Sequence, residues 1–252
     1  MIAILSDVHA NLEALQAVVH DVTQRNIKRI FFLGDIVGYG PNPAEVLDFI
    51  KNFEFCLLGN HDEACLKGPS KGFNPAAAKS AWWTRRQICP DEISGSFLKP
   101  GEHQKRCEQW QYLLSLTPVR TVGEMMFVHD TPAQPGSWRY VRDRAEADLG
   151  FKAHPNMRAF FYGHSHVPGV WTQTNYMKAE PGRKFNFKER VSVNVGSVGQ
   201  PRDKDPRACY VLLEPDGFRF FRVPYDVART QAKIRACADL EPILADRLSL
   251  GQ

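Results

Sequence analysis

Six short apolar runs in this chain each end in polar side chains, and this pattern constrains the fold more than any other feature. The clearest run is Phe31-Phe32-Leu33, which is followed by Gly34 and Asp35. A carboxylate that leaves a buried strand without a partner charge is costly to desolvate, so we interpret Asp35 as a bridge between two metal ions. The other five runs lead to Asp7 and His9, Asn60, His129, His164 and His166, and Asn194. The pattern predicts six strands that deliver polar side chains to one edge.

The chain has the size and composition of one globular domain. It has 252 residues, of which 43% are hydrophobic, and no Gly/Pro-rich or charged linker divides it, so we expect a single domain over residues 1–252. The longest apolar stretches are strand-sized, well below the roughly 20 residues that cross a bilayer, which excludes a membrane protein. Met1 runs directly into a predicted strand without a leader-like segment, and this favours the cytoplasm.

Charge and cysteine usage narrow the function classes further. A formal net charge of +4 is too small to indicate a nucleic-acid partner. Two local basic clusters are either solvated surface or anion contacts, namely Arg139, Arg142 and Arg144, and Arg202, Lys204 and Arg207. The six cysteines form no C-x-x-C pair, which is typical of reduced, structural thiols.

The first sixty residues predict a parallel arrangement of strands. Apolar residues recur at helical spacing from Leu12 to Val22, and the next strand begins at about Arg29, which gives a β-α-β unit. A second helix is expected behind Pro41 and Pro43, before a strand that ends at Leu58.

The rest of the chain departs from this alternation. Residues 64–120 are rich in helix signals and predict a lid or cap. From about residue 167, the turn signals at Pro181-Gly182 and at 215–217 favour antiparallel hairpins, and residues 226–240 predict a helix. We therefore expect an α/β fold of two facing mixed β-sheets flanked by helices, a four-layer α-β-β-α sandwich.

The residue types at the strand ends are those of a catalytic metal site. Imidazole, carboxylate and carboxamide groups suit manganese, iron or zinc, whereas structural zinc usually takes cysteine. Seven ligands exceed what one tetrahedral ion uses, but they divide between two ions if Asp35 is shared. The candidate ligands are Asp7, His9, Asp35, Asn60, His129, His164 and His166.

These motifs resemble those of the calcineurin-like metallophosphoesterases, in particular the small prokaryotic phosphodiesterases and phosphatases. The family pattern is D-x-H, G-D, G-N-H-[D/E], H and G-H-x-H. The chain carries it as Asp7-Val8-His9, Gly34-Asp35, Gly59-Asn60-His61-Asp62, His129 and Gly163-His164-Ser165-His166. The resemblance implies a two-sheet sandwich with flanking helices and metal-dependent hydrolysis of phosphomonoesters or phosphodiesters.

The resemblance also implies a role for each motif residue. Asp7, His9, Asp35 and His166 would hold one metal, and Asp35, Asn60, His129 and His164 the other. We expect manganese, with iron or zinc as alternatives. Two cations about 3.5–4 Å apart can activate a bridging hydroxide for in-line attack on phosphorus. His61 would protonate the leaving oxygen, and Asp62 would orient His61 and favour its cationic form, unless the pair is only structural.

Substrate recognition is expected outside the metal ligands. We select Asn11, Tyr39, Arg142 and Arg202 as substrate-binding residues for a small phosphorylated molecule, such as a nucleotide or dinucleoside polyphosphate. Arg202 could instead pair with Asp203 in a surface turn. The alternatives in function are a protein phosphatase, an inactive interaction scaffold on the same fold and a nuclease. The sequence does not indicate an oligomeric state.

Three further residues leave alternatives open. Asp130 follows His129 where members of this subgroup usually have glycine, and it could support the metal ligands, turn to solvent or pair with Arg139 or Arg142. Trp82 and Trp83 are expected in the core of the lid, although they could also stack on a base.

Overall fold

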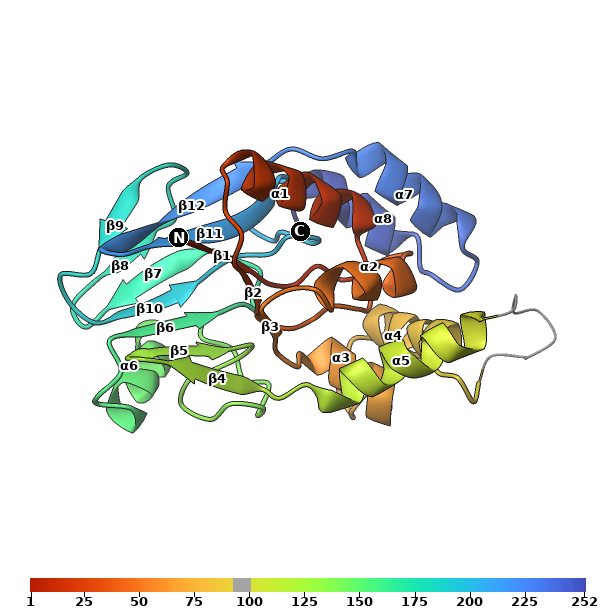
Figure 1. Ribbon diagram of the computed structural model, residues 1–252, viewed down its shortest axis with the longest axis horizontal. Helices are drawn as coiled ribbons and strands as arrows, with labels where there is room; N and C mark the ends of the chain where they lie inside the picture. The colour runs from red at the N-terminus through yellow and green to blue at the C-terminus, as the bar shows by residue number, and fades with distance from the viewer. Residues whose placement is uncertain (93–100) are drawn as a thin grey trace.

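The computed structural model describes residues 1–92 and 101–252, and these residues form two facing six-stranded sheets (Figure 1). The first sheet has the order β3-β2-β1-β11-β12-β9 and the second β4-β5-β6-β10-β7-β8. The strands of the first sheet are β1 (Ile2–Leu5), β2 (Ile30–Phe32), β3 (Phe55–Cys56), β9 (Lys184–Asn186), β11 (Ala208–Glu214) and β12 (Gly217–Val223). Those of the second are β4 (Val119–Val122), β5 (Met125–Val128), β6 (Ala159–Tyr162), β7 (Gly169–Thr172), β8 (Tyr176–Lys178) and β10 (Val191–Asn194).

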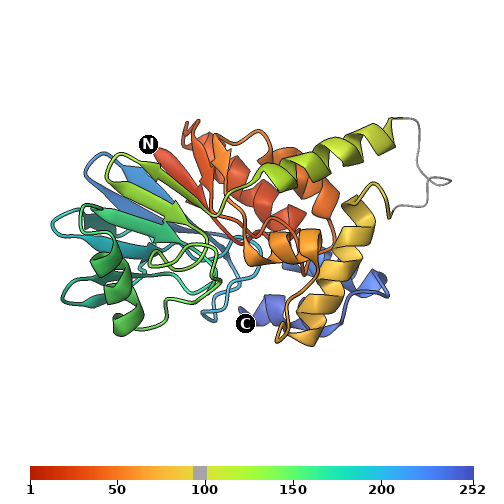
Figure 2. The same cartoon turned by 90° about the horizontal axis from the view of Figure 1, so that it is seen from below.

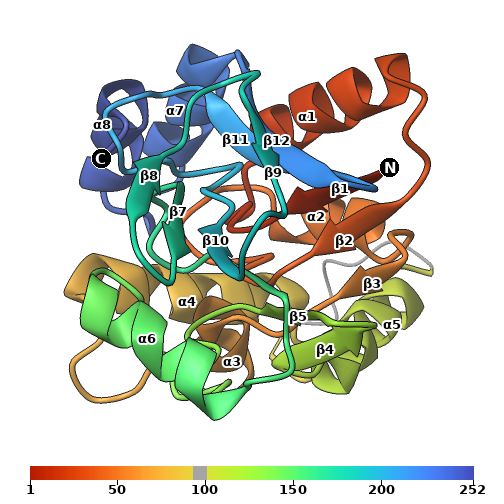
Figure 3. The same cartoon turned by 90° about the vertical axis from the view of Figure 1, so that its left-hand side faces the viewer.

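The helices cover the outer faces and one end of this sandwich. In the end-on view, α1 lies outside the first sheet and α6 lies outside the second (Figure 3). Residues of α2 pack in the same cluster as α1 and the first sheet. The helices are α1 (Leu12–Gln24), α2 (Pro43–Ile50), α3 (Asn60–Lys67), α4 (Pro75–Ile88), α5 (Glu102–Ser115), α6 (Arg144–Ala153), α7 (Val227–Ala236) and α8 (Ile243–Leu250). The predicted fold class of two mixed sheets flanked by helices is confirmed.

The main core lies between the two sheets and is rich in phenylalanine. Phe31 from β2, Phe127 from β5 and Phe161 from β6 are buried there, and the rings of Phe127 and Phe161 stack with their centroids 5.4 Å apart. Removing one such ring typically costs about 3–5 kcal/mol of stability, because the cavity left behind closes only in part. This packing fixes the position of the strands that lead to the polar edge.

The six apolar runs of the sequence are two triplets of parallel strands. In the first sheet β1, β2 and β3 are parallel neighbours, and in the second β5, β6 and β10 are. Parallel neighbours end at the same edge of a sheet, which is where ligands gather in α/β proteins. Asparagine side chains cap the start of two helices. The Asn11 side chain accepts a hydrogen bond from the Ala14 N–H at the start of α1, and the Asn74 side chain accepts from N–H groups at the start of α4.

Two predictions about the C-terminal half are wrong in detail. Pro181-Gly182 is not a hairpin turn, since β8 belongs to the second sheet and β9 to the first, so the chain crosses between the sheets there. The predicted helix 226–240 ends at Ala236, and a separate α8 follows Pro242, which has no N–H to continue a helix. The hairpin of β11 and β12 around Pro215 and Asp216 is confirmed.

Residues 64–120 contain most of the helical end of the molecule. Helices α4 and α5, gold and yellow-green in Figure 2, lie beyond the ends of the sheets. Residues 93–100, which belong to the predicted lid, lie outside the described residues, and the segment's action as a lid stays a prediction. Within the described ranges, no helix combines the length and apolar character needed to cross a membrane.

Candidate metal centre

The predicted ligands leave their strands in an unusual backbone conformation. Asp7, His9, Asp35, His164 and His166 all have φ between 50° and 64°, in the left-handed region. This conformation costs roughly 1–2 kcal/mol for a residue with a side chain. Hydrogen bonds between the loops help to hold it, including those from the Asp7 N–H to the Gly34 carbonyl and from the His9 N–H to the Asp35 carbonyl. Strain of this kind is concentrated at functional sites.

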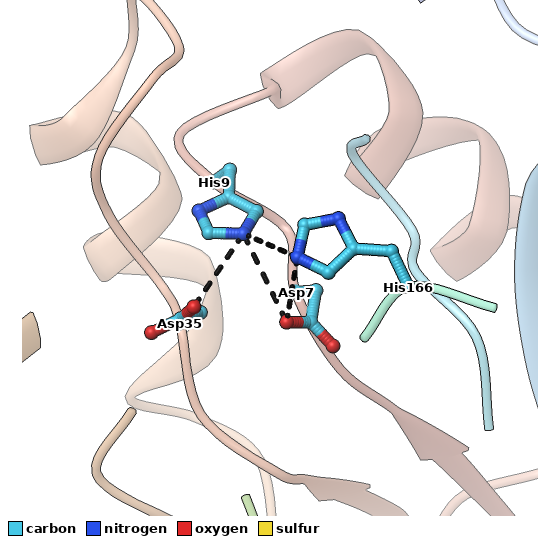
Figure 4. Close-up of side chains that lie close together, drawn as sticks. All are labelled: Asp7, His9, Asp35 and His166. Atoms are coloured by element: carbon cyan, nitrogen blue, oxygen red, sulfur yellow. Dashed lines mark hydrogen bonds and ion pairs between the residues drawn. The ribbon is translucent and has the colours of Figure 1, made fainter. Parts of the chain in front are cut away.

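Four of these side chains form one compact group (Figure 4). Asp7, His9, Asp35 and His166 are at most 2% exposed, and one ligand atom from each lies within 4.8 Å of the others. The Nε2 atom of His166 is 3.2 Å from Oδ1 of Asp7, and Nε2 of His9 is 3.5 Å from Oδ2 of Asp35. The two Nε2 atoms are 3.1 Å apart.

A second group shares Asp35 with the first. Asp35, His129 and His164 also offer ligand atoms that lie within 4.8 Å of one another. Oδ2 of Asp35 is 3.3 Å from Nε2 of His129, and the side-chain oxygen of Asn60 is 3.1 Å from the same nitrogen. Oδ1 of Asp35 accepts the N–H of His61. Asp35 therefore presents one oxygen to histidines of both groups.

The hydrogen bonds of the imidazoles show which nitrogens face the centre. Nδ1 of His9 lies 3.1 Å from the Val37 carbonyl, and Nδ1 of His129 lies 2.8 Å from the Leu33 carbonyl. Nδ1 of His166 similarly faces the Gln200 carbonyl. A carbonyl can only accept, so each Nδ1 carries a proton. Burial lowers the pKa of His9 and of His166, so the Nε2 atoms of these two neutral rings present lone pairs to the centre.

The resulting set of donor atoms fits a cation. Lone pairs that face each other at hydrogen-bond distance repel unless a positive charge lies between them. Nitrogen and oxygen donors without sulfur suit manganese, iron or zinc, and a histidine whose other nitrogen is held by a carbonyl is typical of metal sites. In His164 the roles are reversed, because Nε2 donates to the Trp138 carbonyl and leaves Nδ1 for the group.

The charges of the group also favour a cation. Burial raises the pKa of Asp35, but His129 and His61 outweigh this and hold it well below its usual range. Burial disfavours the cationic form of His129, yet the carboxylates of Asp35 and Asp7 raise the pKa of this imidazole to about 10. The carboxylates of the group are thus ionised and attract positive charge.

Asp62 does not orient His61 as predicted. Its carboxylate accepts four backbone N–H groups, from Asp35, Ile36, Val37 and Gly59, at 2.9–3.1 Å. Burial and the charge of Asp35 raise the pKa of Asp62 to about 7, and the N–H groups oppose this. Asp62 therefore fixes the loop that carries Asp35. Its side chain has no hydrogen bond to the His61 ring in the described part of the chain.

His61 is held by rings rather than by a carboxylate. It packs against Tyr39 and Phe73, with centroid distances of 4.4 and 5.0 Å. Its Nδ1 is buried without a hydrogen-bond partner among the described residues and lies over Gly38, where a Cβ would be 2.5 Å away. Burial lowers the pKa of His61 to about 4 and the charge of Asp35 opposes this, so the protonation that a general acid needs stays a prediction. Nε2 is the nitrogen left to meet a substrate.

Two of the predicted substrate residues lie beside the group in different roles. Asn11 is only 2% exposed, and its amide serves the protein: it donates to the Gly199 carbonyl and the Tyr225 hydroxyl and caps α1. The amide of Asn11 is therefore committed to protein partners, although Asn11 lies close to His9. Tyr39 reaches the metal ligands, because its ring lies 4.8 Å from that of His9.

Arg202 and Arg142 both lie near the ligands but make no ion pair within the described residues. The guanidinium of Arg202 donates to the side-chain oxygen of Gln200 and to the Tyr39 hydroxyl. The suggested pair of Arg202 with Asp203 is wrong, because Asp203 pairs with Arg222. The guanidinium of Arg142 lies 3.8 Å above the Tyr140 ring.

Asp130 supports a loop rather than facing solvent, and it forms no ion pair with an arginine among residues 1–92 and 101–252. It is 1% exposed and accepts the N–H groups of Gly136 and Trp138. The Trp138 carbonyl in turn accepts a hydrogen bond from His164. Asp130 therefore supports the second group indirectly, through the backbone of Trp138. The alternatives of solvent exposure or a pair with Arg139 or Arg142 are wrong.

Sequence reasoning missed two residues that position His164. The Tyr140 ring stacks on the His164 ring with centroids 4.0 Å apart, and the Trp138 carbonyl holds Nε2. Both come from the irregular loop between β5 and α6, which has no periodicity to reveal its contacts. The one available signal was Asp130, which stands where members of the subgroup usually have glycine.

The two neighbouring tryptophans of the predicted lid differ in exposure. Trp83 is buried in the helical core, as expected for the lid, whereas Trp82 is 46% exposed.

Comparison with known proteins places the whole chain among phosphoesterases. The sequence model of the calcineurin-like phosphoesterase superfamily domain matches residues 1–217. An uncharacterized protein of Methanocaldococcus jannaschii is 34% identical over 262 residues, covering 100% of this chain and 98% of that protein. The crystal structure of a metallophosphoesterase from Sphaerobacter thermophilus has a TM-score of 0.83 and 36% identity, covering 100% and 98% of the two chains. A hypothetical protein from Pyrococcus horikoshii shares the fold at 17% identity and a TM-score of 0.76, with 100% and 99% covered.

Proposed function

Because this chain belongs to the calcineurin-like phosphoesterase superfamily and buries an Asp/His cluster that fits a metal site, we propose that it is a binuclear metal-dependent phosphoesterase. It would hydrolyse phosphomonoester or phosphodiester bonds of small molecules. The observation that carries the proposal is the single Asp35 oxygen that faces His9 of one group and His129 of the other. A carboxylate in this position is suited to bridge two cations.

The two groups define the proposed ligand sets. Asp7, His9, Asp35 and His166 would hold one ion, and Asp35, Asn60, His129 and His164 the other. We propose manganese as the working metal, with iron or zinc as alternatives, because the donors are nitrogen and oxygen. When bound, the ions would supply the charge that activates water and neutralises the phosphoryl oxygens.

The chain's own residues would prepare the site before substrate arrives. The Val37, Leu33 and Gln200 carbonyls fix three imidazoles with their Nε2 atoms turned inward, so little reorganisation is needed. His61 would donate the proton to the leaving oxygen from Nε2, since Nδ1 is enclosed against Gly38. This role needs the cationic ring, which the charge of Asp35 favours and a bound phosphate would favour further. Asp62 would serve by holding the loop that carries Asp35.

The direct test is hydrolysis by metal-free and reloaded protein. Full-length protein stripped with a chelator is assayed on p-nitrophenyl phosphate and bis(p-nitrophenyl) phosphate, and then with manganese, iron, zinc or magnesium added. We expect no turnover without metal and recovery of turnover with manganese. The variant His20→Gln, at a histidine outside the motifs, provides a control for nonspecific effects of losing an imidazole. Turnover that survives complete metal removal would refute the proposal.

A further inference from the structure

A cavity of about 510 Å³ lies beside the metal ligands and has no part in the function proposed so far. Its wall contains Arg142, Ser165, Trp171, Tyr176 and Arg202. We propose that it binds the part of the substrate beyond the reacting phosphate, namely a second phosphate and a planar aromatic group, so that the substrate class is a nucleoside polyphosphate. This inference rests on the proposed function, because it places the reacting phosphate at the metal ligands.

The cavity shares a wall with the centre. Ser165 stands between the ligands His164 and His166 in the chain and lines the cavity. Arg202 also lines it, and its N–H donates to the His166 carbonyl. The Arg202 guanidinium reaches the hydroxyl of Tyr39, whose ring packs on His9. A group bound in this cavity is therefore continuous with a phosphate held at the ligands.

Two guanidinium groups give the cavity its preference for an anion. In the described ranges neither Arg142 nor Arg202 forms an ion pair with a carboxylate, and Arg202 has only neutral partners, in Gln200 and Tyr39. Arg202 is partly buried and Arg142 is exposed. A guanidinium without a carboxylate partner is free to bind an anion, and phosphate matches its fork of donors. A substrate whose only phosphate is bound at the metal ligands would leave the positive charge of these two guanidinium groups without a negative partner.

The opposite wall provides a surface for an aromatic group. Trp171 on β7 and Tyr176 on β8 are cross-strand partners, and their ring centroids lie 4.5 Å apart. The Tyr176 ring approaches β7 closely over Gly169, where a Cβ would lie 2.6 Å from the tyrosine hydroxyl. Tyr176 nevertheless remains 47% exposed. Trp171 is half-buried behind it. An exposed tyrosine backed by a tryptophan, in the same cavity as two arginines, is a combination that stacks on a base while its phosphate is held.

A second cavity of about 420 Å³ is the rival position for the same groups. Its lining includes Asn60 and His164 together with Lys67 and Lys71. Because two of the candidate ligands line it, this cavity belongs to the centre already described, and we assign it to the reacting phosphate. The two positions are separable by mutation.

The experiment measures binding rather than turnover. Calorimetry on the manganese-loaded protein compares adenosine 5′-(α,β-methylene)diphosphate with methylenediphosphonate and with the phosphonate analogue of AMP, in which a methylene group replaces the 5′ oxygen so that no phosphomonoester bond is present. We expect Arg142→Gln to weaken binding of adenosine 5′-(α,β-methylene)diphosphate and of methylenediphosphonate about tenfold. Tyr176→Leu should weaken binding of the two adenosine probes about tenfold and leave methylenediphosphonate unchanged.

Matched variants control for general effects. Arg139→Gln removes an exposed arginine of the same loop outside this cavity, and Trp82→Leu removes an aromatic ring that is 46% exposed, close to the 47% of Tyr176. Both should leave all three affinities unchanged. If Tyr176→Leu fails to fold, the Arg142→Gln comparison still decides, because that guanidinium lies on the surface. Unchanged binding in the cavity variants, or weakening by Lys71→Gln in their place, would overturn the inference.

Its failure is distinguishable from failure of the proposed function. If the cavity variants weaken binding but the protein hydrolyses no phosphoester, the cavity's role in binding stands and the proposed enzyme activity is refuted. Metal-dependent hydrolysis of aryl phosphates with cavity-independent binding would keep the enzyme and overturn the cavity's role.

Discussion

The Nε2 atoms of His9 and His166 lie 3.1 Å apart, although each ring directs Nδ1 to a backbone carbonyl. Two lone pairs therefore face each other inside a buried group that also contains ionised Asp7 and Asp35. This arrangement is unfavourable without a cation, so metal binding and folding stability should be linked.

Removing the metal should destabilise the protein. A ligand present at 100 times its dissociation constant adds about 2.7 kcal/mol to stability. For a chain of this size that corresponds to roughly 5–10 °C in Tm. Differential scanning calorimetry of metal-loaded and chelator-treated protein provides the measurement. The variant His9→Gln should lose most of the difference, and an unchanged Tm in native protein would argue against a cation at this position.

Asp62→Asn should damage stability rather than proton transfer. The carboxylate accepts four backbone N–H groups, two on each oxygen, and an amide can accept on one side only. Two unsatisfied donors cost about 2–6 kcal/mol together. Urea denaturation measures this loss, and Asp246→Asn, which breaks an exposed pair with Arg235, should cost less than about 1 kcal/mol. Native stability in Asp62→Asn would contradict the structural role.

Asp130→Asn should weaken metal binding at the second group. Asp130 holds the N–H of Trp138, and the Trp138 carbonyl holds His164. Loss of such indirect support typically lowers metal affinity about 10–100-fold. Activity titrated against manganese should show a shifted midpoint and full recovery at high metal. As a matched control, Asp143→Asn removes a carboxylate charge at the N-cap of α6 but keeps a capping oxygen, and it should leave the midpoint unchanged. A higher KM that added metal does not correct would point to substrate contact.

His61→Ala should retain the metal and lose turnover. A general acid contributes about 10²–10⁴-fold, and no metal ligand is removed. The loss should be large for alkyl esters, whose leaving groups need a proton, and small for p-nitrophenyl esters, which leave as stable anions. Elemental analysis checks that metal content is unchanged. An equal loss on both kinds of ester would exclude the role.

The metal centre was predictable because its ligands follow strands. The two triplets of parallel strands appear in the sequence as apolar runs, so side chains just beyond them had to meet at one edge. The assignment of Asp35 and His129 to one ligand set came from the family resemblance, because strand order alone does not say which side chains at the edge meet.

The contacts of the surrounding loops were not predictable. Asp62 binds backbone N–H groups, which every residue has, so no partner residue type in the sequence reveals its role. Arg202 bonds Gln200 and Tyr39 although the adjacent Asp203 offered a simpler pair. The helix α6 was missed because its buried face consists only of Ala147, Gly150 and Phe151, which is a weak periodic signal.

The most direct test of this account is the number of metal ions bound per chain. Asp35 offers one oxygen to both groups, so Asp35→Asn withdraws negative charge from two sites at once. Native and Asp35→Asn proteins are equilibrated with manganese, dialysed and analysed for metal and protein. We predict two ions per native chain and a loss at both sites in the variant. A native stoichiometry that stays at one with manganese in excess would contradict the two-metal centre.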